Sequence, residues 1–240
     1  MRTTRSTAAL LAVALLALAG CGDDDEPEAD TTTSTTSTTV ADSTTTTTVP
    51  AGLEQPAIWP AADVVFDRPE DAAEDFVREV LGVPPTLGEF QQGDARSGEV
   101  DVFSTGEGET PTSVVRSRLL LRQLVPDDGW FVVGAVNDNA AITTPASSAE
   151  VPAGSLTVSG RARGFEATVV VRAFVAGDAE IELDRQVTTG GALETPEPFT
   201  ATLDLSGAPA GSVVALLVQG GTGLETDPGD FGAIPVVVEG

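Results

Sequence analysis

The fold is decided by residues 156–172, which read LTVSGRARGFEATVVVR. In the first half apolar and polar residues alternate, and this period of two is typical of a strand with one buried and one solvated face. The apolar run 168–175 begins after Gly164 and Glu166 have interrupted the alternation. The stretch therefore predicts two strands joined by a short connection.

The same alternation returns on both sides of this stretch, from residue 140 to residue 240. Gly, Pro and Asp separate the predicted strands, which are residues 141–144, 156–162, 168–175, 181–187, 199–205, 213–219 and 233–238. Seven short strands in about 100 residues are typical of an all-β immunoglobulin-like sandwich. Neither Cys nor Trp occurs in this part, so we expect side-chain packing alone to hold the two sheets together.

These residues also resemble a known family. The stretch 156–172, together with PFTATL at residues 198–203, is similar to the immunoglobulin-like domain of bacterial spore germination proteins, over residues 142–238. The resemblance implies an interaction or structural module without catalysis, in a secreted or lipid-anchored protein and often beside another small domain. Residues 93–100 and 132–135 resemble the companion domain of actinobacterial lipoproteins.

The N-terminus predicts a lipoprotein signal peptide over residues 1–21. Arg2 and Arg5 precede an apolar run, residues 8–19, that is too short to span a hydrocarbon core of ~30 Å. The run ends in LAGC, which resembles the bacterial lipobox, whose Cys is acylated. Cys21 is the only Cys of the chain, so we expect a lipid anchor on the outer side of the cell membrane. An ordinary secretory signal is the alternative.

Residues 22–55 predict a disordered tether. An acidic block comes first, and 15 of the 18 residues from Thr31 to Thr48 are Ser or Thr. Such a segment has too little apolar surface to offset the entropy that ordering would cost. We interpret it as a stalk that carries the folded part away from the membrane, or as a spacer with no role beyond its length.

Residues 56–139 predict a small α+β domain. Apolar residues recur at helical spacing over residues 67–81, where Asp67 is the expected cap and Pro69 suits the first turn. Strands are predicted at residues 86–91, 99–104, 113–125 and 130–136, and the last two form a hairpin through a Pro-Asp-Asp-Gly turn. One helix on an antiparallel sheet gives an α+β domain, and the order is similar to nuclear-transport-factor-like or cystatin-like cones.

The composition narrows the chemistry. The net charge is −25, all 12 basic residues are Arg, and the chain has no Lys, His or Tyr. His-based catalysis, His metal ligands and Lys Schiff bases are therefore excluded. Nucleic acid is not expected as a partner, because phosphate binding requires clustered positive charge. We predict no cofactor and no enzyme activity.

The first candidate site is an apolar face of the sandwich. Two predicted strands are apolar on both faces, and a sheet with two apolar faces needs a second partner. The candidate interaction face consists of Val170, Phe174, Val214, Leu216 and Val218. We expect it to contact the first domain or another protein. The alternative is a tolerably apolar free surface.

The second candidate is a stripe of Arg116, Arg118 and Arg122, which the period of two places on one face of the strand 113–125. Three guanidinium groups on one face predict an anion site. The alternative is a solvated face in which these residues pair with Glu99, Asp101 or Glu107 across the sheet.

The third candidate is a weak metal site in the acidic loop Glu225, Asp227 and Asp230. Calcium takes oxygen ligands from loops of this kind, but the spacing differs from that of an EF-hand. We therefore interpret the loop as a solvated turn and predict no metal site, with calcium binding as the alternative.

Together these features predict a binding or scaffolding lipoprotein of the bacterial envelope, with a protein partner and with germination-type or sporulation-type assemblies as one setting. Capture of a small ligand near Trp130 in the first domain is an alternative within binding. An envelope hydrolase that uses two facing carboxylates is the alternative from another class.

Overall fold

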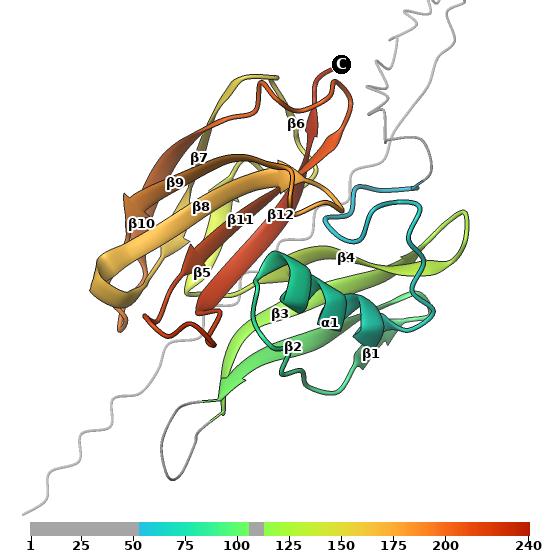
Figure 1. Ribbon diagram of the computed structural model, residues 1–240, viewed down its shortest axis with the longest axis horizontal. Coiled ribbons are helices and arrows are strands. Elements are labelled where there is room, and N and C mark those ends of the chain that lie inside the picture. Colours follow the sequence, from blue (N-terminus) through green and yellow to red (C-terminus); the bar gives the residue numbers. More distant parts are fainter. Residues whose placement is uncertain (1–52, 106–112) are drawn as a thin grey trace, which may run out of the picture. The chain divides into compact units, whose positions relative to one another are not determined.

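The computed structural model describes residues 53–105 and 113–240 (Figure 1). The predicted signal peptide, Cys21 and the tether up to residue 52 lie outside the described residues. In the described part of the chain, no helix has both the length and the apolar character that crossing a membrane requires.

Helix α1 (Pro69–Val80) is amphipathic, as its apolar spacing predicted. Its N-cap is Arg68 and Pro69 occupies the first turn, so the prediction that Asp67 caps the helix is wrong. Pro69 fixes the backbone at the start of the helix without a side-chain cap, because its missing N–H needs no partner there. The buried face consists of Ala72, Ala73, Phe76, Val77 and Val80.

Four antiparallel strands follow the helix. They are β1 (Gln91–Asp94), β2 (Ser97–Thr105), β3 (Ser113–Leu124) and β4 (Gly129–Val136). The predicted β3–β4 hairpin is confirmed. The predicted strand 86–91 is wrong except for its last residue, because Leu87 forms only an isolated bridge to Val102. The strand begins later, at the hairpin whose turn is closed when Asp94 accepts the Arg96 N–H at 2.8 Å.

The remaining strands build the sandwich. They are β5 (Ala140–Thr144), β6 (Glu150–Val151), β7 (Ser155–Ala162), β8 (Thr168–Val175), β9 (Glu182–Thr189), β10 (Glu197–Asp204), β11 (Val213–Gly220) and β12 (Asp230–Val238), with a 3-10 turn, η1, at Phe165–Ala167. Each of the seven predicted strands is present. The two-residue strand β6 was not predicted, since two residues show no periodicity.

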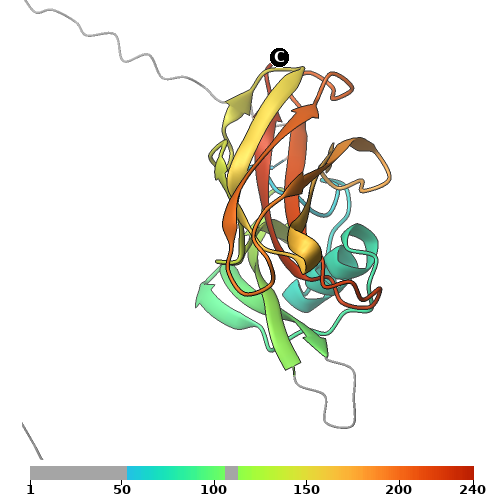
Figure 2. The same cartoon turned by 90° about the vertical axis from the view of Figure 1, so that its left-hand side faces the viewer.

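The sandwich has two layers (Figure 2). One sheet has the order β10-β7-β5, and the facing strands run in the order β12-β11-β8-β9. Their inner faces bury a core that includes Val158, Val171, Leu203, Leu216 and Val236. The immunoglobulin-like sandwich is therefore confirmed.

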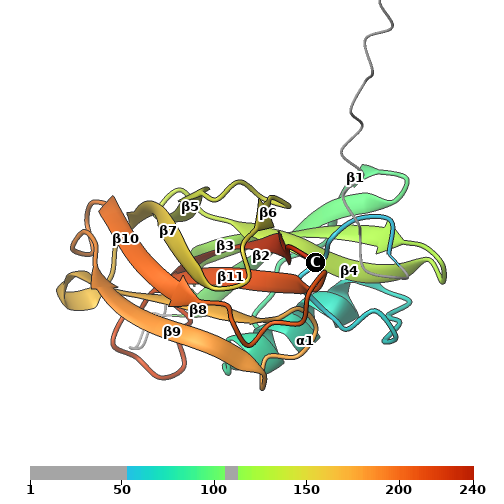
Figure 3. The same cartoon turned by 90° about the horizontal axis from the view of Figure 1, so that it is seen from above.

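The second sheet continues beyond the sandwich. Its full order is β1-β2-β3-β4-β12-β11-β8-β9, and β4 joins β12 through the pair Ala135 and Ala233. Helix α1 lies on the outer face of this sheet, whereas β7 lies on the other side (Figure 3). A second core therefore forms between α1 and the sheet, and it takes residues from both parts of the chain.

Candidate functional site

The five residues of the predicted interaction face do not share one face. In the pairing of β8 with β11, Phe174 lies opposite Ala215 and Arg172 lies opposite Leu217. Paired residues point to the same side of a sheet. Phe174 and Val170 therefore lie on the outer face, whereas Val214, Leu216 and Val218 point into the sandwich core. This prediction is corrected because the pairing register, which the sequence did not reveal, decides which face each residue joins.

The outer face is covered by the chain itself. We call Phe174, Ala215, Leu217, Phe231 and Ala233 the junction face, and all five are buried in the core that also contains α1. The rings of Phe76 and Phe231 lie 6.5 Å apart between their centroids. Burial of a large apolar side chain stabilises a fold by about 1.5–3 kcal/mol, so the junction is a strong contact within the chain.

A polar contact borders the junction face. Arg172 Nη1 donates to the carbonyl oxygen of Val80 at the end of α1, at 3.0 Å. Its Nε donates to Glu182 at 2.7 Å. Glu182 also accepts hydrogen bonds from Arg185, and these bonds, followed by those from Arg172, lower the pKa of Glu182. Arg172 thus links β8 to the helix while Glu182 holds the guanidinium in place.

The three arginines of the predicted stripe have separate surroundings. Arg118 pairs with Asp101 at 2.7 Å and Glu99 at 3.1 Å, as the alternative interpretation expected for this residue. Arg116 is the extra residue of a β-bulge, since Val102 pairs with Ser117 and Phe103 with Val115. The bulge turns Arg116 toward Ser104, whose hydroxyl accepts from Nε at 2.7 Å.

Arg122, the third member of the stripe, has a buried Nε without a hydrogen-bond partner among the described residues. It lies in a shallow pocket with Ser97 and Glu99. The three guanidinium groups therefore do not converge on a common anion site, and this prediction is corrected. The bulge removes Arg116 from the common face, while Arg118, which shares a face with Arg122, is engaged by Glu99 and Asp101.

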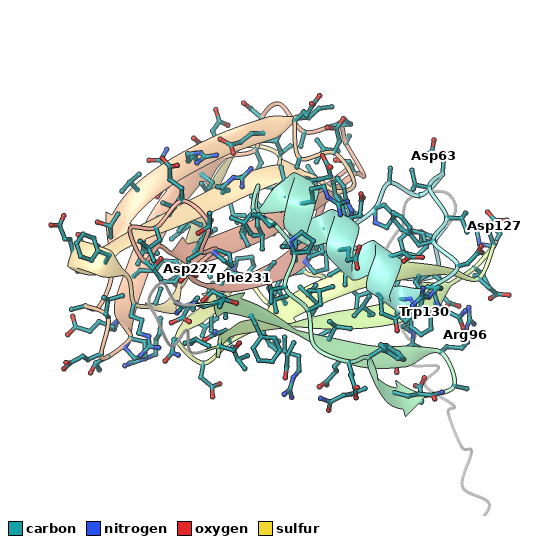
Figure 4. All side chains as sticks on the ribbon, turned by 60° about the horizontal axis from the view of Figure 1, so that its bottom comes forward. Asp63, Arg96, Asp127, Trp130, Asp227 and Phe231 are labelled. Carbon is teal, nitrogen blue, oxygen red and sulfur yellow. The ribbon has the colours of Figure 1, made fainter. Side chains whose placement is uncertain are left out.

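The acidic loop has two buried members. The side chains of Asp227 and Asp230 are 7% and 6% exposed, and both contact Arg116. Asp230 also accepts from Arg163 Nε at 2.8 Å. Figure 4 shows Asp227 and, at the start of β12, Phe231. The loop therefore joins the first part of the chain to the sandwich through ion pairs.

The three candidate ligands of the acidic loop, Glu225, Asp227 and Asp230, do not form one metal site. Glu225 is exposed, while Asp227 and Asp230 face arginines. Over residues 53–105 and 113–240, no cluster of three acidic, His or Cys side chains has the arrangement to hold a metal ion. The geometry therefore does not support the weak candidate site in this loop, because guanidinium groups occupy the place that a cation would need.

Sequence reasoning missed a surface at one end of the sandwich. Three connections meet there: residues 163–167, 190–196 and 221–229, which we call the loop end. The Gly164 N–H donates to the Gly191 carbonyl at 3.0 Å, and the Phe165 N–H donates to the Gly221 carbonyl at 2.8 Å. These bonds place the three loops side by side.

Each loop of the loop end exposes one large apolar side chain. Phe165 is 48% exposed, Leu193 46% and Leu224 42%. An open groove of about 500 Å³ lies between Phe165 and Leu193, and its border includes Glu166, Glu194 and Glu197. One feature of the sequence could have predicted this surface: each of three Gly-containing turns has a large apolar residue, where polar residues are usual.

Arg163 holds the loop end together. Its Nε binds Asp230 at 2.8 Å, and its Nη1 donates to the Glu194 carbonyl at 3.4 Å. Gly191 permits the close approach of the backbone, because a Cβ at this position would overlap the carbonyl oxygen of Thr195. Arg163 thus connects its own loop to the second loop and to the start of β12, and Asp230 continues the contact to Arg116 on β3.

Comparisons with known proteins agree with this architecture. Residues 139–220 match the family model described as the immunoglobulin-like domain of bacterial spore germination. The predicted resemblance is therefore confirmed for this part of the chain, which ends at β11. Searches among curated proteins and among solved structures gave no match.

Proposed function

We propose that this protein is a lipid-anchored, extracytoplasmic binding or scaffolding protein of the bacterial envelope, and that its loop end contacts a protein partner. One observation carries the proposal: Phe165, Leu193 and Leu224 remain exposed on neighbouring loops. Grouped apolar side chains at a surface are typical of interaction sites. The match to a spore germination domain makes a germination-type or sporulation-type assembly our first candidate setting.

The domain organisation belongs to the same proposal. Residues 1–21 act as the lipoprotein signal peptide, residues 22–55 as the tether, residues 56–139 as an α+β domain and residues 140–240 as the immunoglobulin-like domain. We propose that this is the arrangement of an actinobacterial-type lipoprotein. The junction face joins the two folded parts through one shared core.

The lipid anchor has a direct test. A diacylglyceryl group on Cys21 inserts two acyl chains, and each buried CH₂ contributes ~0.8 kcal/mol. The wild-type chain should sediment with membranes and incorporate labelled fatty acid, whereas Cys21→Ser should do neither. Equal membrane association of both chains would contradict the anchor.

The binding role is tested with loop-end variants. Intact envelopes are cross-linked with the wild-type chain, the double variant Phe165→Ser/Leu193→Ser, and Ile181→Ser as a control. Ile181 is similarly exposed but lies outside the loop end. We expect a discrete partner that the double variant loses and the control keeps. Retention of that partner by the double variant would overturn the proposed site.

The small-ligand alternative has weaker support. Helix α1 packs on the sheet with Phe76 and Val77 fully buried, and Trp130 packs edge-on against Phe90 at 5.3 Å between ring centroids. These side chains fill the space that a ligand cone would need. A pocket of about 190 Å³ beside Ala57 and Val213 is smaller than typical ligand sites of roughly 300–1,000 Å³. A pocket of about 340 Å³ beside Arg118 and Val136 reaches that range, but Trp130 does not line it.

The hydrolase alternative also lacks a suitable pair of acids among residues 53–105 and 113–240. Asp227 and Asp230 are the best buried candidates, and both face the guanidinium of Arg116. Acid catalysis at a glycosidic bond needs a proton on one of two carboxyl groups that flank the substrate. The guanidinium of Arg116 lies against both carboxylates, where such a substrate would have to bind, so we propose binding rather than catalysis.

A further inference from the structure

We infer that the loop end binds a protein segment in which basic residues flank an apolar side chain. This inference rests on the proposed binding function and adds the chemistry of the partner. The apolar side chain would enter the groove between Phe165 and Leu193. The basic residues would face Glu166, Glu194 and Glu197.

The apolar part of the argument starts from the groove. Phe165 and Leu193 come from different loops, and each leaves almost half of its surface in water. The groove between them, about 500 Å³, can receive a large side chain. A partner side chain placed there would cover both residues at once, which is how a single apolar anchor contributes most of the affinity of an interface.

The charges around the groove select the partner. Glu166, Glu194 and Glu197 are exposed, as is Glu225 on the third loop. Two arginines lie nearby. Asp230 compensates the charge of Arg163, and Arg161, which donates to the Pro196 carbonyl at 2.6 Å, keeps its charge but is outnumbered by the glutamates. The border therefore keeps a net negative charge, and complementary charge gives specificity and speeds association.

The backbone of the loop end is already arranged for binding. Hydrogen bonds join residues 163–167 to both other loops, and Arg163 fixes a carbonyl of the second loop. Glu166 and Ala167 adopt left-handed backbone angles, with φ of 54° and 58°. Such angles for residues other than Gly cost free energy and concentrate at functional loops. A rigid surface loses little conformational entropy on binding.

Charge also distinguishes the molecules that could occupy the groove: a second copy of this chain, a membrane surface or a segment of another protein. A second copy of this chain carries the same net charge of −25 and would be repelled. An anionic membrane surface would likewise repel the glutamates. A basic segment of another protein satisfies both the groove and its border, so it is the occupant we propose.

The test is a selection of random displayed peptides on the full chain. We expect the selected peptides to be enriched in Arg or Lys next to Leu, Ile or Phe. A synthetic peptide from this set should bind the wild-type chain, and the double variant Phe165→Ser/Leu193→Ser should abolish binding. Recovery of acidic or purely apolar peptides, or of no peptide, would overturn the inference.

Charge variants separate the inference from the proposed function. The triple variant Glu166→Gln/Glu194→Gln/Glu197→Gln should weaken peptide binding about tenfold, and added salt should weaken binding to the wild type. The matched control Glu79→Gln/Glu180→Gln/Glu239→Gln removes three exposed charges elsewhere and should bind as wild type. If the double variant loses the envelope partner while the triple variant keeps full peptide affinity, the binding function stands and the basic partner is excluded.

Two further measurements address the other occupants. The Cys21→Ser full chain, which lacks the acylation site, is mixed with vesicles of equal parts phosphatidylcholine and phosphatidylglycerol, and we expect no binding. Vesicle binding that Phe165→Ser removes would assign the loop end to the membrane and overturn the inference. Light scattering should give a monomer, and a dimer that the same substitution dissociates would also overturn it. Equal melting temperatures of all variants show that they are folded.

Discussion

Two apolar surfaces of the same sandwich differ in their exposure to solvent. The junction face, with Phe174, Leu217 and Phe231, is fully buried under α1. The loop end, with Phe165 and Leu193, is nearly half exposed. Both are apolar, so composition does not separate a structural surface from a binding surface. The difference lies in whether an element of the same chain covers the surface.

The largest effect is expected at the centre of the junction face. Phe231→Ala removes a fully buried ring beside Phe76 and should lower the free energy of unfolding by about 3–5 kcal/mol. Urea denaturation measures this, and we expect one transition because α1 and the sandwich share a core. The control Leu224→Ala should stay within about 0.5 kcal/mol of wild type. Two separate transitions in the wild-type chain would contradict a shared core.

The ion pairs between the two parts should give the next effect. Arg116→Ala leaves the buried Asp227 without its cation and removes one of the two arginines that contact Asp230, so we expect a loss of about 3 kcal/mol in unfolding free energy. Arg118→Ala serves as the control. Its side chain is 44% exposed, so its ion pairs contribute less than about 1 kcal/mol. Equal losses from both variants would show that burial does not distinguish these pairs.

A smaller and pH-dependent effect is expected at the border of the junction face. The pKa of Glu182 is lowered in the folded state. Its charge therefore stabilises the fold above pH 4.5, the ordinary pKa of Glu, and this stabilisation is lost as the pH falls through the folded-state pKa. Because solvent screens this partly exposed group, Glu182→Gln should cost no more than about 1 kcal/mol at pH 7 and progressively less below pH 4.5. Thermal unfolding at several pH values measures this. A cost that does not change with pH would exclude the charge as its cause.

The smallest effect on stability is expected at the loop end. Phe165→Ser should change the free energy of unfolding by no more than about 0.5 kcal/mol, because the ring is already partly solvated. Phe174→Ser, on the junction face, should cost more than 3 kcal/mol. Chemical denaturation of the pair compares the two surfaces directly. Similar losses would mean that Phe165 is a core residue.

Much of the fold could be predicted from local patterns. Segments in which apolar and polar residues alternate, separated by Gly and Pro, predicted the seven strands of the sandwich. The spacing of Phe76, Val77 and Val80 predicted the helix. The functional surfaces depended on long-range geometry. The β8–β11 register, which places Leu217 rather than Leu216 beside Phe174, is set by pairing across about 40 residues of chain.

The loop end shows the same limit in another form. A bulge turns Arg116 away from the face that the sequence predicted. Its contacts with Asp227 and Asp230 join residues more than 100 positions apart in the sequence. Phe165, Leu193 and Leu224 lie on three loops that only the folded sandwich brings together. A single apolar residue in a loop does not indicate a binding site, so only the folded structure reveals that the three side chains form a patch.

The central claim is that the loop end, and not another exposed apolar position, meets a partner in the envelope. The most direct test places a photo-crosslinking amino acid at position 165 or at position 181 of the full chain in intact cells. We predict a discrete crosslinked product from position 165 and none from position 181. The same product from both positions, or no product from position 165, would contradict the account.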